Sequence, residues 1–149
     1  MLNELLCGDK NAADFYLQVA RWSHTYDDLV DGDKVLTAEH LHTFVWRMLF
    51  GIPLNPFFVA HQDTLRPLLM TGILNWIAAN EMEQSKKTEE LRVSHIIRYS
   101  VGDILLASMV LTGGVEHARA NARRARLAIQ DETWLHYATE KGAPNDHQN

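Results

Sequence analysis

Cysteine is almost missing from the sequence, since Cys7 is the only one among 149 residues. One cysteine excludes an internal disulfide, so we expect the fold to need no oxidising compartment and the protein to be cytoplasmic. Zinc coordination is disfavoured as well, because the sequence has no cysteine pair and no two histidines four residues apart.

Long apolar runs are also missing. The two most apolar stretches, residues 68–79 and 104–115, are shorter than the roughly 20 residues that cross a bilayer. The first nine residues lack the basic start and the sustained apolar run of a secretory signal. We therefore expect both stretches to be core helices, and we expect no membrane partner.

Excess positive charge is absent, since 14 Lys and Arg residues stand against 19 Asp and Glu residues and the net charge is −5. This balance disfavours a general nucleic-acid binder. Hydrophobic residues make up 46% of the chain and charged residues 22%, which excludes a disordered chain. The length fits one domain, and we predict a single helical domain over residues 1–144 with a frayed polar tail over residues 145–149.

Strand patterning is scarce, whereas apolar residues recur at spacings of three and four in several windows. We therefore predict an all-α fold, a bundle of five or six helices. The predicted helices cover residues 11–31, 38–50, 56–84, 88–111 and 115–139, with a charged connection over residues 81–90.

Glycine, proline and a capping threonine set the predicted helix ends. Gly32 permits a left-handed stop after the first helix, and Thr37 is placed to cap the next one. Pro67 lies inside the third segment, where it either kinks one helix or opens a second one. The pair Gly113–Gly114 predicts the end of the fourth helix.

Carboxylates crowd the end of the first predicted helix, where Asp27, Asp28, Asp31 and Asp33 lie within seven positions. Asp27 and Asp31 share one helix face, and like charges at this spacing destabilise a helix. Acids in the last turn also oppose the helix dipole. Because Mg²⁺ prefers oxygen ligands and would remove both penalties, we predict Mg²⁺ as a cofactor held by Asp27, Asp28 and Asp31. The alternative is that these acids only cap and solubilise a helix end.

The same helix carries two apolar surfaces. The larger stripe is predicted to face the core and consists of Phe15, Val19, Trp22, Tyr26 and Leu29. The smaller surface begins with small or apolar residues and continues into acids, in the order Ala13, Leu17, Ala20, His24, Asp27 and Asp31. This second surface predicts a cavity with an apolar lining that is closed by acids.

The stretch Asp27-Asp28-Leu29-Val30-Asp31 resembles the aspartate-rich DDxxD motif of isoprenyl diphosphate synthases and class I terpene synthases. In that all-α family the aspartates hold Mg²⁺ against the substrate diphosphate. The resemblance therefore implies a diphosphate substrate here. The chain has only about half the length of those enzymes, so it implies a reduced relative or an assembled dimer.

Terpene synthases carry a second metal-binding element, in which Asn, Ser or Thr, and Glu follow one another at four-residue spacing. Asn75, Ala79 and Glu83 keep this spacing and lose the hydroxyl group. The resemblance implies that Asn75 and Glu83 complete the metal site from a facing helix.

A second resemblance is to the all-α NTP pyrophosphohydrolases of the MazG and dimeric dUTPase type. These short, oligomeric proteins place EExxE-like and ExxD-like motifs on facing helices around Mg²⁺ and a nucleoside triphosphate. Asp27-Asp28-x-x-Asp31 is similar to the first motif with Asp in place of Glu, and Asn80-x-x-Glu83 comes near the second. This resemblance implies a triphosphate substrate and a homo-oligomer.

Arginines supply candidate phosphate ligands. We expect Arg92 or Arg98 to meet the substrate phosphates. Asp103 lies in apolar surroundings, so we expect it either to pair with Arg92 or a base of another helix, or to belong to a site. A basic edge recurs along the last predicted helix at Arg119, Arg123 and Arg126. Either this edge clamps a phosphate or it is a solvated face that pairs with nearby acids.

Two hypotheses for function follow. The first is a Mg²⁺-dependent enzyme that acts on a diphosphate or triphosphate ester of a small molecule, as a hydrolase or as a prenyl-type transferase or lyase. The alternative is a small, non-enzymatic helical adaptor or regulatory protein of a phage or mobile element. Such an adaptor would hold a protein partner through the arginine edge and an exposed aromatic patch.

Overall fold

The computed structural model describes residues 1–32 and 34–142. Within these residues the chain is helical and contains no strand, which confirms the predicted all-α class. The helical elements are α1 (Leu2–Leu5), α2 (Lys10–Asp31), α3 (Ala38–Trp46), the π-helical η1 (Arg47–Gly51), α4 (Pro56–Ser85), α5 (Thr88–Ile97), α6 (Val101–Ile129) and α7 (Trp134–Glu140). Five of these elements within the described ranges, α2 to α6, are α-helices of nine residues or more.

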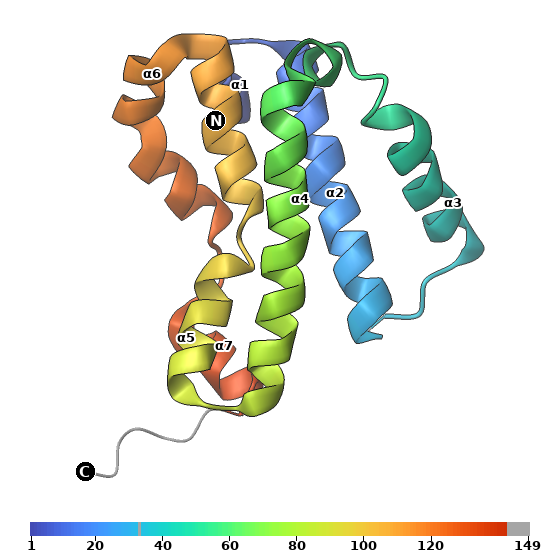
Figure 1. The fold of residues 1–149 in the computed structure, drawn as a ribbon, viewed down its shortest axis with the longest axis vertical. Coiled ribbons are helices and arrows are strands. Elements are labelled where there is room, and N and C mark those ends of the chain that lie inside the picture. The colour runs from blue at the N-terminus through green and yellow to red at the C-terminus, as the bar shows by residue number, and fades with distance from the viewer. Residues whose placement is uncertain (33, 143–149) are drawn as a thin grey trace.

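The bundle is organised around three long helices. α2, α4 and α6 pack against one another along the long axis of the molecule (Figure 1). α5 packs on the second half of α4 and carries α7, whereas α3 lies on the outer side of α2. α1 contacts both α2 and α6.

Side-chain caps fix several helix starts and agree with the predicted boundaries. Asp9 accepts hydrogen bonds from Asn11 and Ala12 at the start of α2, and Gly32 ends that helix with φ +69°. Thr37 caps α3, and His40 completes a capping box there. The predicted helices 11–31 and 38–50 are therefore confirmed, the second with a π-helical last turn.

Proline does not divide the third helix. α4 is one long helix that contains Pro67, and its backbone leaves helical geometry at His61, with φ −125° and ψ 20°. Of the two alternatives predicted, one kinked helix is present, but its kink lies at His61 and not at Pro67. The predicted connection 81–90 was too long, because α4 continues to Ser85 and only residues 86–87 join it to α5.

The predicted helix 88–111 was wrong, because it is broken at residues 98–100 into α5 and α6. Within this turn the Ser100 hydroxyl donates to the Ile97 carbonyl. The same hydroxyl accepts from Asn75 Nδ2 of α4, so the break between α5 and α6 is held by one local bond and one contact to α4. The break predicted at the glycine pair is present as a kink, since Gly114 has φ +79° inside α6. The predicted helix 115–139 was also wrong, because α6 ends at Ile129 and Thr133 caps a separate α7.

The core forms where α2, α4 and α6 meet. Phe15 of α2 is fully buried and its ring packs on Phe57 and Phe58 of α4. The predicted core stripe of α2 is buried at Phe15 and Val19 and becomes exposed at Leu29. The single helical domain stays a prediction, and the predicted tail over residues 145–149 lies outside the described residues.

One helical region of the described fold has the length and composition of a membrane span, and a second one does only if a bent pair of helices is counted as a single span. Residues Thr88–Glu140 contain an 18-residue window of high hydropathy, 33% of which is buried inside the protein. The segments Ala38–Gly51 and Pro56–Ser85 pass the same test together, although they are bent by 87°. In the bundle, Ile104, Leu105 and Met109 pack in the core, which is the role predicted for the stretch 104–115.

Candidate functional site

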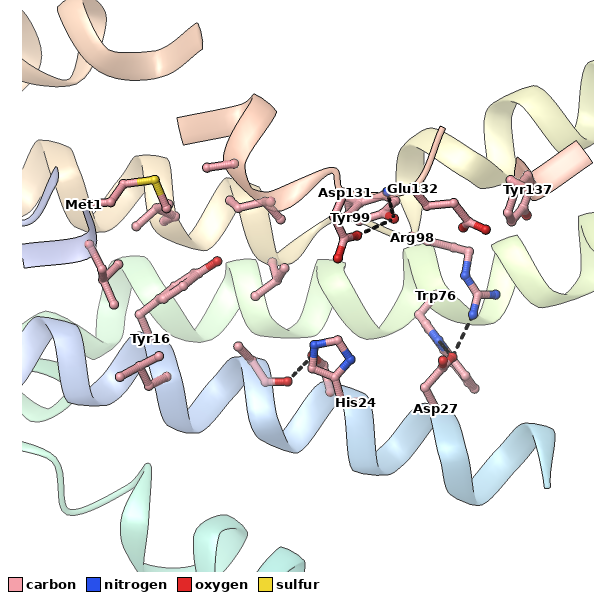
Figure 2. Close-up of a pocket in the computed structure, with 18 of the residues that line it drawn as sticks. Met1, Tyr16, His24, Asp27, Trp76, Arg98, Tyr99, Asp131, Glu132 and Tyr137 are labelled. Carbon is pink, nitrogen blue, oxygen red and sulfur yellow. Dashed lines mark hydrogen bonds and ion pairs between the residues drawn. The ribbon is translucent and has the colours of Figure 1, made fainter. Parts of the chain in front are cut away.

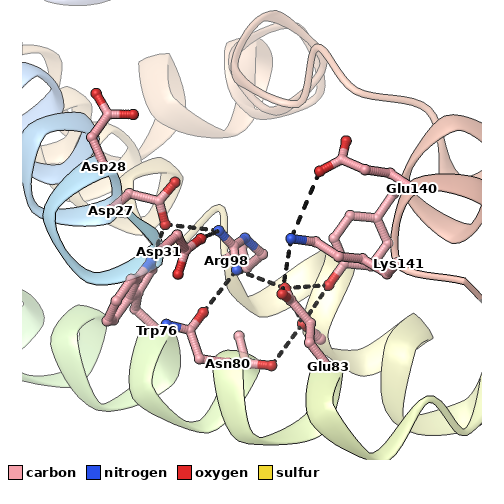
Figure 3. A network of polar contacts seen from close by, with 12 residues as sticks. Asp27, Asp28, Asp31, Trp76, Asn80, Glu83, Arg98, Glu140 and Lys141 are labelled. Carbon is pink, nitrogen blue, oxygen red and sulfur yellow. Dashed lines mark hydrogen bonds and ion pairs between the residues drawn. The ribbon is translucent and has the colours of Figure 1, made fainter. Parts of the chain in front are cut away.

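The candidate site is built around Arg98, which lies in the turn between α5 and α6 and is only 15% exposed. Its Nη2 atom donates to Asp27 Oδ1 at 2.7 Å and lies 3.8 Å from Asp31 Oδ2. Its Nη1 atom donates to Glu83 Oε1 at 2.6 Å and to Asn80 Oδ1 at 2.9 Å (Figure 3). One guanidinium thus joins oxygens from two helices, α2 and α4.

The α2 side of the site carries the less compensated charge. Asp27 Oδ1 accepts a second hydrogen bond from Trp76 Nε1 at 2.7 Å. Asp31 makes the longer contact to Arg98. Burial, followed by the charge of Asp27, raises its pKa above the usual value, although the charges of Arg98 and Lys141 oppose this shift. Negative charge at Asp31 is therefore unfavourable in the fold as it stands.

The α4 side is held more firmly, because four groups contact Glu83. Tyr137 donates to its Oε1 atom at 2.6 Å, Ser94 at 3.1 Å, and Lys141 lies 3.0 Å from its Oε2 atom. Burial of this carboxyl opposes ionisation, but the hydrogen bond from Tyr137 and the charges of Arg98 and Lys141 outweigh it. The pKa of Glu83 therefore lies below its usual value.

A cavity of about 530 Å³ lies between α2 and the segments that contain α6 and α7 (Figure 2). Its apolar wall includes Met1, Leu2, Leu5, Leu17, Ala20, Val101, Leu105, Ala128 and Ile129. Its charged wall consists of Asp27, Asp31, Asp131, Glu132, Glu140, Arg98 and Lys141. Five acids and two bases line the described cavity, so its wall carries a net charge of about −3 at neutral pH.

This cavity is the one predicted from the smaller surface of α2. Leu17, Ala20, His24, Asp27 and Asp31 all line it, in the predicted order from apolar to acidic. Ala13 departs from the prediction, because it packs against the core. The helical periodicity of the first long helix was therefore sufficient to place the cavity.

The structure brings some predicted site residues together and holds others elsewhere. Asp27, Asp31, Glu83 and Arg98 form one network. The remaining three predicted residues have other contacts: Asp28 pairs with Lys34, Asn75 donates to Ser100, and Arg92 pairs with Glu89 and lies over the Trp134 ring.

Several network members were not predicted from the sequence. Tyr137 and Lys141 come from the last described helix and the turn that follows it, and Trp76 comes from α4. Asn80 was noted only as part of an incomplete ExxD-like motif. Helical spacing is the sequence signal that could have identified Trp76 and Asn80, since both lie on the same face of α4 as Glu83.

Arg119 and Arg126 of the predicted basic edge, and the neighbouring Arg124, pair with acids, so this edge of α6 is a solvated face. Arg119 contacts Glu116 in the same helix. Arg124 contacts Glu4 of α1, whereas Arg126 contacts Asp103, which lies earlier in α6 itself. Asp103 was expected to pair with Arg92 or with a base of another helix, and it pairs instead with Arg126 of its own helix, where its side chain is about half exposed.

A group of possible metal ligands runs along α7, from just before its first turn to its last residue. Ligand atoms of Glu132, His136 and Glu140 are all within 4.8 Å of one another. The hydrogen bond and the charge of Glu132 raise the pKa of His136, which lies on the surface. Glu132 and Glu140 also contribute to the charged wall of the cavity.

No known protein family, curated protein or solved structure matches the chain.

Proposed function

We propose that the protein is a Mg²⁺-dependent enzyme that acts on a diphosphate or triphosphate ester bound in the cavity. The observation that carries this proposal is the convergence of Asp27 and Asp31 from α2, which line the cavity, with Glu83 from α4 on the Arg98 guanidinium. Acids that meet next to a cavity are an arrangement suited to binding a metal and a phosphate together.

The donor set suits a hard cation. Carboxylate oxygens of Asp27, Asp31 and Glu83, with the amide oxygen of Asn80, are the ligand types that Mg²⁺ prefers. The raised pKa of Asp31 supports the same assignment, because a nearby cation would favour its ionised form. When bound, Mg²⁺ would neutralise phosphate charge and polarise the phosphoryl oxygens.

The charge of the cavity explains why a metal would be required. A wall of net charge about −3 repels a phosphate that arrives alone. Mg²⁺ between the acids and the phosphate would reverse that repulsion. Substrate binding should therefore depend on the divalent cation.

The bases of the network would contact the phosphate. Arg98 presents a planar fork of donors that matches phosphate oxygens, and Lys141 adds a second positive charge on the same wall. Both side chains now neutralise the acids. The apolar wall would hold the organic group of the ester, and its burial would exclude water from that end of the cavity.

The experiment is a release assay on a panel of diphosphate and triphosphate esters, with Mg²⁺ and with EDTA. We expect Mg²⁺-dependent release of phosphate or pyrophosphate by the wild type, and a loss of at least about 100-fold in Asp31→Asn. Asp28→Asn is the matched control, because Asp28 belongs to the same motif but pairs with Lys34 outside the network. Equal activity of Asp31→Asn and the wild type would contradict the proposal.

A further inference from the structure

An exposed apolar surface covers α3, η1 and the turn that follows. We define this α3–η1 face by its exposed large apolar residues, which are Leu41, Val45, Trp46, Met48, Leu49, Phe50 and Leu54. Residues 38–46 are all described, and none of them is buried. The face is therefore a helix surface that the bundle itself does not cover.

Only one side of this segment packs on the rest of the protein. The Phe44 ring lies 6.2 Å from the Trp22 ring of α2. At the other end a Cβ atom on Gly51 would lie 2.0 Å from Gln18 Oε1, so η1 approaches α2 closely there. Within the described chain, α3 contacts only α2 and η1, which leaves the opposite side facing outward.

The exposed area is of the size that a stable interface needs. The seven side chains of the face are 37% to 69% exposed. At about 200 Å² for each large side chain they present on the order of 700 Å² of apolar surface. This exceeds the largest patch of many monomers, roughly 300–600 Å², and approaches the roughly 800 Å² that each partner buries in a standard interface.

The charge pattern favours a second copy of the chain over other occupants. Arg47 is the only Asp, Glu, Lys or Arg between Glu39 and Asp63. In a twofold interface the same patch meets itself, so like charges would be brought together, and a nearly neutral apolar face avoids that repulsion. A surface helix for anionic membranes is typically rich in Lys and Arg, whereas this chain has a net charge of −5.

Two aromatic residues provide an anchor at the centre of the segment. The rings of Trp46 and Phe50 lie 4.6 Å apart, and both side chains are exposed. Tryptophan is among the residues that contribute most to binding energy when an interface buries them, and an aromatic pair held in contact before binding lowers the entropy cost of docking.

We propose that the α3–η1 face is the interface of a symmetric homodimer in which Trp46, Leu49 and Phe50 of two copies pack together. This inference goes beyond the proposed enzymatic function and does not depend on it. α2 separates the two sites, because it presents Leu17 and Ala20 to the cavity. Its Gln18 and Trp22 approach η1 and α3 instead. The dimer would thus leave the cavity accessible.

The test is the mass in solution, measured by sedimentation equilibrium over a concentration series. We expect a dimer for the wild type and at least about a 100-fold weaker association for Leu49→Glu, since a charge would then be buried without a partner. Leu127→Glu is the matched control, because Leu127 is an equally exposed leucine, 63% against 60%, on α6. Circular dichroism verifies that each variant keeps its helical content.

Two results would overturn the proposal. One is a wild type that stays monomeric at every concentration, and the other is a Leu49→Glu variant that dimerises as tightly as the wild type. A monomeric wild type that co-sediments with neutral phosphatidylcholine vesicles, or that captures a different protein through Leu49, would assign the face to that occupant instead. Failure of the enzymatic proposal is distinguishable, because the release assay does not depend on this face.

Discussion

Replacing Arg98 by glutamine removes the positive charge that joins α2 to α4. In the variant, Asp27, Asp31 and Glu83 keep only Lys141 as a basic partner among the pairs of this network. Removing one partner of a fully buried ion pair costs about 3–5 kcal/mol. Because these carboxylates are 12% to 35% exposed, solvent screens part of this cost. We therefore expect a loss of about 2–4 kcal/mol.

The assay is urea unfolding followed by tryptophan fluorescence, with and without Mg²⁺. We expect Mg²⁺ to restore part of the stability of Arg98→Gln, because the divalent cation would neutralise the carboxylates that the guanidinium neutralised before. Arg119→Gln is the control, since Arg119 and its partner Glu116 are both largely exposed, and its cost should stay below about 1 kcal/mol.

The pH dependence of this loss provides an internal check. The folded-state pKa of Glu83 is lowered, so its contribution to stability is present above the pKa of the unfolded state and is lost as pH falls through the folded value. The difference between the wild type and Arg98→Gln should therefore be largest near neutral pH and shrink in acid. A cost below about 1 kcal/mol at neutral pH would show that Arg98 does not hold the network together.

Three further variants test single features of the structure by the same unfolding assay. Asp31→Asn should be more stable than the wild type at neutral pH without metal, because the raised pKa of Asp31 shows that the fold disfavours the charged carboxylate. A variant less stable than the wild type would contradict this. Tyr137→Phe should lose about 1–3 kcal/mol, since it removes the hydroxyl between Glu83 and the buried Ser94, and an unchanged midpoint would show that the bond contributes little. Gly114→Ala should lose about 1–3 kcal/mol, because alanine is strained at φ +79° and ψ 172°, and a neutral effect would mean that the kink adapts.

Local sequence signals were sufficient to predict the helices and the acidic end of the cavity in the first part of the chain. Asp27 and Asp31 follow Leu17 and Ala20 on one helix face by periodicity alone, and this placed the acids at one end of a cavity. Gly32 marked the end of the same helix, because glycine adopts the left-handed conformation there. These features depend on neighbours within a few turns of helix, which the sequence displays directly.

The rest of the site depends on contacts between distant segments. Arg98 lies in a turn that contains no glycine or proline from which it could have been predicted. Its bond to Asp27 joins residues 71 positions apart. Tyr137 reaches Glu83 only because the last predicted helix is divided and α7 docks on α5. Neither contact leaves a periodic signal in the sequence.

The eight-residue spacing between Asn75 and Glu83 did not predict which elements these two residues contact. Residues eight positions apart lie on neighbouring parts of a helix surface, but α4 packs against several elements at once. Asn75 therefore contacts Ser100 at the start of α6, whereas Asn80 and Glu83 reach Arg98. Each face of a helix in the middle of a bundle packs against a different element, and the sequence alone does not identify which element packs on which face.

Calorimetric titration of Mg²⁺ in the presence of pyrophosphate determines whether Asp27 and Asp31 bind Mg²⁺ at the charged end of the cavity. We expect saturable binding by the wild type and by Asp28→Asn, and its loss in Asp31→Asn. Absence of binding in the wild type, or equal binding by Asp31→Asn, would show that these acids do not form the metal site.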